Sequence, residues 1–265
     1  MRILNKNMVR QLSDGISLPR YDRKNCKTGI VHFGMGAFHR AHQAVYTDTA
    51  LGFAGGNWQI CGVSLRSPRV KNFLEPQDYL YTVAEKNGKS RKYRLIGSIN
   101  NVMFAPDESE KLLFRMTTPQ IRIVSLTVTE KGYHHSPATG RLNHTSLDIK
   151  HDLRNLNSPK TVIGYLTKAL AERRDKGIAP FTVLSCDNLS ENGNTLRRVV
   201  LDFAALISDK LAGWIEKEVA FPCTMVDRIV PATTEEDKIT AEVELYARDE
   251  GLVVTEPYCQ WVIED

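Results

Sequence analysis

Short apolar runs and segments of helical apolar spacing alternate along the first part of the chain. The run 28–33 predicts a strand, and Gly34 and Gly36 follow it directly. Apolar positions recur at helical spacing over residues 38–49, and the run 58–65 predicts the next strand. This order of strand, glycine turn, helix and strand predicts a βαβ unit.

Two β-rich runs interrupt this alternation. Residues 79–84 and 93–96 flank the step Asn87-Gly88, which is the strongest short-range signal for a hairpin. The hairpin is therefore predicted to be an insertion in, or an extension of, the main sheet. Residues 1–27 are polar and irregular, and we expect them to form a lead-in segment.

The rest of the chain returns to alternating strands and helices. A loop containing Gly132, Pro137 and Gly140 separates two of these elements. The pattern predicts an α/β fold with a doubly wound, mostly parallel sheet, in one domain over residues 28–265. The predicted helices are 68–74, 108–116, 160–176, 194–207, 210–219 and 234–248, and the predicted strands are 121–128, 181–185 and 252–255.

Composition narrows the class of protein. The chain has 35 basic and 31 acidic residues without a run of like charges, which argues against a nucleic-acid partner. The local excess of base at residues 86–94 is expected to be the solvated rim of the hairpin. Five widely spaced cysteines predict free thiols. With no signal-peptide pattern and no apolar run of about 20 residues, we expect a cytoplasmic protein without membrane contact.

The glycine turn is the first candidate site. A side chain at Gly34 or Gly36 would hinder a tight turn or keep a pyrophosphate from the backbone, and the following helix offers free N–H groups. The usual third glycine is replaced by His39, and a bare GxG is also compatible with an ordinary turn. Its place at the first βα junction favours dinucleotide binding.

The end of the second predicted strand lacks the acidic residue that usually binds the ribose of NAD. Arg66 and Arg69 stand there instead, and no carboxylate precedes Glu75. Two arginines could accept the additional phosphate of NADP, or they could simply face solvent. The choice between NAD and NADP stays open at this point.

Five blocks in the sequence closely resemble the polyol-specific long-chain dehydrogenases, a family that includes mannitol 2-dehydrogenase and fructuronate reductase (mannonate oxidoreductase). They occur in the family's order and span residues 30–265. The blocks are IVHFGMGAFHRAHQAVYTD from Ile30, SLTVTEKGYHHSPATG from Ser125, FTVLSCDNLSENG from Phe181, FPCTMVDRIVPATT from Phe221, and the tail EPYCQWVIED.

The resemblance implies a Rossmann-type domain that is followed, in typical members, by a mainly helical catalytic domain. The family's catalytic lysine belongs to a K-x4-N-x2-H helix, and that pattern does not occur in this sequence. We therefore expect the lysine to lie beyond Asp265, so that the chain holds no catalytic acid or base. A stand-alone dinucleotide-binding module without catalysis is the alternative.

The resemblance also assigns roles to residues. Gly34, Gly36 and Phe38 would form the pyrophosphate turn, with Arg40 close by in the same signature. NAD is the implied cofactor, and NADP is possible through Arg66.

On the substrate side, Asn188 would reach the nicotinamide and the substrate, and Asp227 would face the substrate pocket. Asp187 and Asn188 could instead cap the following helix, and Asp227 could form an ion pair with Arg228. The helical spacing of His39 and His42 could suit a metal, but no further ligand of suitable spacing accompanies them, so no metal is expected.

The substrate implied is a small polyol or sugar acid. TVTEKGY together with WVIED is similar to fructuronate reductases, whereas GVSLRSPRVKNFL is similar to mannitol dehydrogenases. Mannitol/fructose is the expectation, with mannonate/fructuronate as the alternative.

Overall fold

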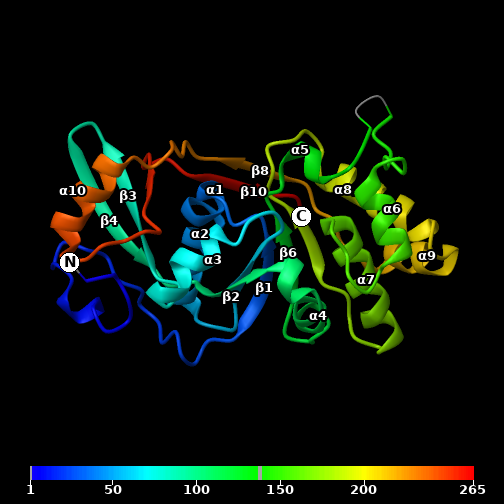
Figure 1. Cartoon of the computed structure of the whole chain (residues 1–265), viewed down its shortest axis with the longest axis horizontal. Helices are drawn as coiled ribbons and strands as arrows, with labels where there is room; N and C mark the ends of the chain where they lie inside the picture. Colours follow the sequence, from blue (N-terminus) through cyan, green and yellow to red (C-terminus); the bar gives the residue numbers. More distant parts are fainter. Residues whose placement is uncertain (1, 137–138) are drawn as a thin grey trace. The chain divides into compact units, whose positions relative to one another are not determined.

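The computed structural model describes residues 2–136 and 139–265, and these form two compact units. The first unit comprises residues 1–29, 35–103 and 227–260, and the second comprises 30–34, 104–226 and 261–265. Pro137, in one of the predicted loops, lies outside the described residues. Figure 1 labels the helices and strands along the chain.

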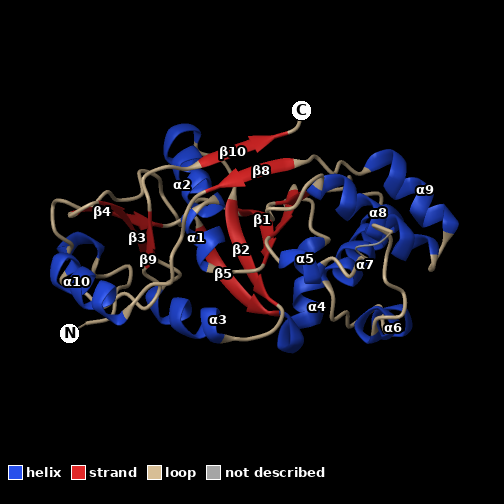
Figure 2. Cartoon of the chain, turned by 90° about the horizontal axis from the view of Figure 1, so that it is seen from above, coloured by secondary structure: helices blue, strands red, loops and turns tan. Residues whose placement is uncertain are grey.

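The predicted parallel sheet is confirmed. A five-stranded sheet has the order β5-β2-β1-β6-β7, and its strands are drawn in red in Figure 2. β1 (Thr28–Phe33) pairs in parallel with β6 (Ile123–Leu126), which pairs in parallel with β7 (Thr182–Ser185). β2 (Gln59–Ser64) is buried along its whole length, as is typical of a strand covered on both faces.

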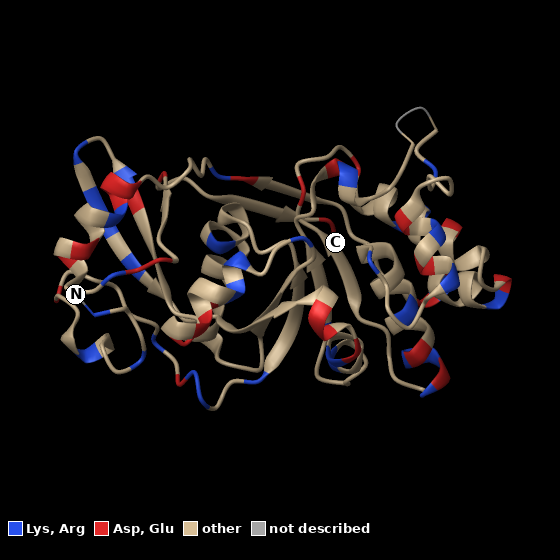
Figure 3. Cartoon of the chain, viewed as in Figure 1, with Lys and Arg blue, Asp and Glu red and all other residues tan. Residues whose placement is uncertain are grey.

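The predicted hairpin is also confirmed and extends into a small sheet of its own. β3 (Tyr81–Asn87) and β4 (Ser90–Ile96) are antiparallel, with Asn87 opposite Ser90, and Gly88 in the turn has φ +58°. β9 (Val253–Thr255) pairs in parallel with β3. In this region Arg91 forms an ion pair of 3.1 Å with Asp237, so acidic charge from α10 (Glu235–Leu245) compensates part of the basic rim (Figure 3).

The N-terminal segment is an integral part of the first unit. Its apolar side chains enter a buried cluster with residues of β3, β4, α10 and β9. Leu4 N donates to Arg248 O (2.8 Å), and Ser17 N donates to Tyr93 O (3.1 Å). This packing was not predicted, because the apolar residues of the segment are spaced too irregularly to indicate an element. They are Leu4, Met8, Leu12 and Ile16.

Local capping explains where several helices begin. Thr161 Oγ1 accepts from Gly164 N at the start of α7 (Val162–Asp175), which begins two residues after the predicted start at residue 160. Thr234 and Asp237 form the capping box that opens α10. The helix predicted over residues 38–49 is two helices, α1 and α2, because His42 leaves the helical region at φ −117° and ψ −92°.

The remaining elements follow the predicted alternation, with additions that the sequence did not indicate: β5, β8, β10, α5 and α6. In the first unit they are η1 (Val9–Gln11), α1 (Ala37–Ala41), α2 (Gln43–Ala54), α3 (Arg69–Leu74), η2 (Glu75–Gln77), β5 (Ile99–Phe104) and α10 (Glu235–Leu245). In the second unit they are α4 (Ala105–Met116), α5 (Thr129–Gly132), α6 (Leu147–Arg154), α7 (Val162–Asp175), α8 (Asn192–Ala205) and α9 (Asp209–Glu218). The strands β8 (Thr224–Asp227) and β10 (Gln260–Ile263) form a two-stranded sheet. No helix among the described residues is both long and apolar enough to cross a membrane.

Candidate functional site: a glycine turn after the first strand

Gly34 closes the turn at the end of β1 and can only be glycine there. Its φ is +99°, in the region that side chains disfavour. A Cβ built on Gly34 would overlap the carbonyl oxygen of Thr127, just after β6. The turn therefore lies directly against the end of the neighbouring strand.

Gly36 has a different reason to be glycine. Its backbone, at φ −74° and ψ 177°, is open to any residue, and a Cβ there would meet nothing within 4 Å. Gly36 is the exposed N-cap of α1, and no side chain caps this helix. The open space in front of the first helical amides is what a phosphate group needs in order to reach the backbone.

Phe38 of α1 packs against His42 at the break that follows the helix, and His42 is fully buried. Their rings stack at 4.9 Å and 15°, and the His42 ring also meets Tyr46 edge-on at 5.3 Å. His42 Nε2 donates to Gln260 O (2.8 Å), because a carbonyl can only accept. Burial lowers the pKa of His42, which favours its neutral form.

Arg40 points inward from the same helix. Its guanidinium donates to Gly251 O and lies over the rings of Phe73 (5.3 Å) and Tyr81 (5.6 Å). Tyr81 Oη in turn donates to Arg40 O (2.7 Å), and burial lowers the pKa of Arg40. These contacts attach α1 to the segment that follows α10.

That segment is centred on a buried carboxylate. Asp249 accepts hydrogen bonds from Thr82 N and Oγ1 (both 2.6 Å), Gln77 Nε2 (2.8 Å) and Gly251 N (2.8 Å). Burial raises the pKa of Asp249, and these bonds oppose the rise. We call Gln77, Thr82, Asp249 and Gly251 the Asp249 cluster; it holds the carbonyl that receives Arg40.

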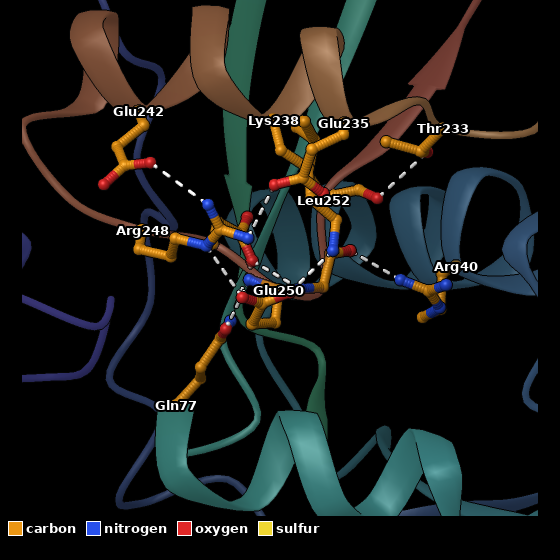
Figure 4. Close-up of polar contacts among 11 residues, drawn as sticks. Arg40, Gln77, Thr233, Glu235, Lys238, Glu242, Arg248, Glu250 and Leu252 are labelled. Carbon is orange, nitrogen blue, oxygen red and sulfur yellow. Dashed lines mark hydrogen bonds and ion pairs between the residues drawn. The ribbon is translucent and has the colours of Figure 1, made fainter.

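An ion-pair network continues from the Asp249 cluster toward α10 (Figure 4). Arg248 pairs with Glu235 (2.8 Å), Glu242 (3.4 Å) and Glu250 (2.7 Å). Glu250 is shared with Lys238 at 2.6 Å, and its backbone N–H donates to Gln77 Oε1 (2.7 Å). The carboxylate of Glu250 is thus neutralised by two cations.

A cavity of about 460 Å³ is lined by the segment that follows β2, together with residues of α10 and the segment after it. Arg69 belongs to its lining, whereas Arg66 is exposed nearby in the sequence. Within this lining Glu250 is paired with Lys238, and Arg69 adds a further positive charge. The lining residues are Ser67, Pro68, Arg69, Asn72, Phe73, Lys238 and Glu250.

Asn188 is exposed in the loop that follows β7, in the second unit. The preceding Asp187 accepts from Val128 N (3.1 Å), Thr129 N (2.9 Å) and Tyr133 Oη (2.9 Å). The alternative that Asp187 or Asn188 caps the next helix is wrong, because the N-cap of α8 is Glu191. Asp187 instead binds its own loop to the loop after β6, and burial raises its pKa.

Asn192, which the sequence reasoning missed, fixes the other end of this loop. Its amide nitrogen donates to Asp187 O and Thr224 O (both 3.0 Å), and its amide oxygen accepts from Thr224 N (2.9 Å). Thr224 Oγ1 donates to Ser185 O (2.6 Å). An Asn-Gly step at the start of a helix was the only signal for it in the sequence.

Asp227 is exposed at the end of β8, in the first unit. The alternative of an ion pair between Asp227 and Arg228 is wrong, because Arg228 pairs with Glu85 (2.7 Å) and donates to Ala41 O (2.6 Å). The charge of Asp227 raises the pKa of His42, against the larger effect of burial.

The predicted site residues are distributed over the two compact units. Gly36, Phe38, Arg40, Arg66 and Asp227 belong to the first unit, and Gly34 and Asn188 to the second. His39 is fully buried beside Arg40, and within residues 2–136 and 139–265 no group of three or more His, Cys, Asp or Glu side chains could hold a metal ion.

The family model described as the mannitol dehydrogenase Rossmann domain matches residues 28–265. The D-mannonate oxidoreductase of Escherichia coli (strain K12) is 46% identical over 254 residues, which are 94% of this chain and 52% of that protein. A mannitol 2-dehydrogenase of Pyricularia oryzae is 43% identical over 260 residues, which are 96% of this chain and 52% of that protein. The chain spans about half the length of these curated relatives.

A solved structure agrees with these matches. The mannitol 2-dehydrogenase of Pseudomonas fluorescens, in a ternary complex with NAD and D-mannitol, has a TM-score of 0.96 and 44% sequence identity. The match covers 100% of this chain and 55% of that chain. The likeness therefore extends over both compact units.

Proposed function

Since the chain belongs to the mannitol dehydrogenase family, we propose that it binds NAD(H) at the turn between β1 and α1. The observation that carries this proposal is the open space before Gly36, at the uncapped start of α1. NAD, when bound, supplies the C4 position of its nicotinamide as acceptor or donor of hydride. The protein supplies binding and orientation.

Each proposed site residue is assigned to one part of the cofactor. Backbone N–H groups of the turn at Gly34 and Gly36 bind the pyrophosphate, and Phe38 lies beside it. Arg66, which follows β2, binds the adenosine ribose, and Asn188 binds the nicotinamide end. Arg40 contributes through Gly251, because its guanidinium is buried against that carbonyl.

The reaction class we propose for the whole protein is reversible hydride transfer between nicotinamide and a polyol, with mannitol/fructose as the substrate pair and Asp227 on the substrate side. The likeness to the P. fluorescens enzyme supports this pair. The 46% identity to the D-mannonate oxidoreductase supports a second candidate, mannonate/fructuronate.

A fluorescence titration of the chain with NADH tests the proposed function. We expect saturable binding of NADH, together with no detectable oxidation of mannitol or mannonate by these 265 residues alone. The reason is that the sequence lacks the K-x4-N-x2-H pattern, and a general acid or base of this kind contributes about 10²–10⁴ to the rate. Failure to bind NADH would refute the cofactor proposal, and clear turnover would refute the assignment of the acid/base to another segment.

Cofactor preference is expected to respond to the arginines after β2. Replacing both Arg66 and Arg69 by alanine should raise the Kd for NADPH by about tenfold, because the 2′-phosphate loses its nearest cations. The Kd for NADH should rise less, by roughly twofold to threefold, since its ribose loses a hydrogen bond with Arg66 but carries no such phosphate. Titrations with both cofactors measure the ratio.

The matched control replaces Lys89 and Lys92, both exposed on the hairpin, and removes the same net charge. An equal loss of NADPH affinity in this control would show a general effect of charge. An unchanged ratio of the two Kd values in the arginine variant would contradict the role of Arg66.

A further inference from the structure

A row of polar side chains is buried inside the parallel ladder just before the glycine turn. His32 on β1 lies opposite Ser125 on β6 in the register, and both are fully buried. Gly34 and Thr127 come two residues later, just after the ends of these two strands. Polar groups at such a position require hydrogen bonds, because burial without them is costly.

The hydrogen bonds within this row have a defined direction. His32 Nε2 lies 3.3 Å from Gly34 O and 3.0 Å from Thr127 Oγ1, and a carbonyl can only accept, so Nε2 carries the proton. In the neutral ring, Nδ1 then accepts from Ser125 Oγ (2.8 Å). A single tautomer of His32, protonated at Nε2, is thus compatible with its hydrogen bonds on both sides of the ring.

Thr127 connects this row to the turn. Its hydroxyl donates to Gly34 O (2.8 Å) while accepting from His32, and its backbone N–H donates to Phe33 O (2.8 Å). The carbonyl of Gly34 and the N–H of Met35 belong to one planar peptide and point in opposite directions. Fixing the carbonyl therefore also fixes the direction in which the Met35 N–H points.

We propose that the row Ser125–His32–Thr127 positions the Gly34 peptide for pyrophosphate binding, with His32 and Thr127 as positioning residues. This inference rests on the proposed function, because the ligand it serves is the dinucleotide. The row itself does not contact the cofactor. It holds the turn in the orientation that binds the pyrophosphate, so the free energy cost of ordering the turn is not paid on binding.

Paired substitutions at Thr127 test the proposal in the chain as it stands. Thr127→Val keeps the shape but removes the hydroxyl, and Thr127→Ser retains it. We expect Thr127→Val to raise the Kd for NADH by roughly threefold to tenfold, the effect of one lost hydrogen bond, with Thr127→Ser near the wild type. His32→Leu should also raise the Kd for NADH. In the double variant of His32→Leu and Thr127→Val, the loss of binding free energy should be smaller than the sum of the two single losses.

Two competing ligands separate positioning from a general structural effect. ADP carries the pyrophosphate and adenosine does not, so Thr127→Val should weaken ADP and leave the competition by adenosine unchanged. Parallel losses of ADP and adenosine, or Thr127→Val binding NADH like the wild type, would overturn the inference while leaving the proposed function intact. Absence of NADH binding to the wild-type chain would overturn both, and thermal unfolding shows which variants are folded.

Discussion

Gly36→Val is expected to weaken NADH binding at least about 100-fold while lowering the stability of the chain by only about 1 kcal/mol or less. The valine side chain would occupy the open space before α1, which we assign to the pyrophosphate. The backbone at φ −74° accepts any residue, and exchanging one N-cap residue changes the free energy of unfolding by about 1 kcal/mol or less. We expect the Kd for NADH to rise at least about 100-fold in a fluorescence titration.

Gly34→Ala is the matched comparison, two residues away. Its Cβ would overlap the carbonyl of Thr127 at a φ of +99°, so both binding and stability should fall, the latter by about 2–4 kcal/mol. Urea unfolding and NADH titration of the two variants measure the contrast. If Gly36→Val bound NADH normally, the pyrophosphate would have to lie elsewhere.

Asp249→Ala is expected to produce the largest loss of stability, about 3–5 kcal/mol in the free energy of unfolding. The substitution removes the acceptor of four hydrogen bonds and leaves buried donors on Thr82, Gln77 and Gly251 without it. Urea unfolding followed by circular dichroism measures the change. NADH affinity should fall as well, because Arg40 holds α1 through Gly251.

Asp175→Ala is the control for the loss of one carboxylate. Asp175 is 65% exposed and pairs with its neighbour Arg174, so stability should stay within about 0.5 kcal/mol of the wild type. A loss of less than about 1 kcal/mol in the free energy of unfolding of Asp249→Ala would contradict the stabilising role of the Asp249 cluster. It would indicate that water replaces the carboxylate as acceptor of these hydrogen bonds.

The sequence by itself determined the elements whose signals are local. Strand β1, the glycine turn and strand β2 were predicted from an apolar run, Gly34 and Gly36, and a second apolar run. The hairpin was predicted from the step Asn87-Gly88; in the structure Asn87 ends β3 opposite Ser90, and Gly88, at φ +58°, opens the two-residue turn. The capping box at Thr234 similarly depends on residues only three positions apart.

Elements without a local signal escaped prediction. β8 and β10 are short and largely exposed, so their side chains do not show the pattern of a buried strand. The break at His42 was missed because apolar spacing continues through it while the backbone turns. The packing of residues 4–16 depends on partners more than 60 positions away, such as Leu80 and Leu245.

Within the candidate site, the sequence located the residues and the tertiary structure decided what each side chain does. Arg40 stands in the cofactor signature, yet its guanidinium is buried against Gly251, 211 positions away in the chain. His32, Asn192 and Asp249 carried no predicted role. Their importance arises from burial together with distant hydrogen-bond partners, and only the folded chain brings those partners within reach.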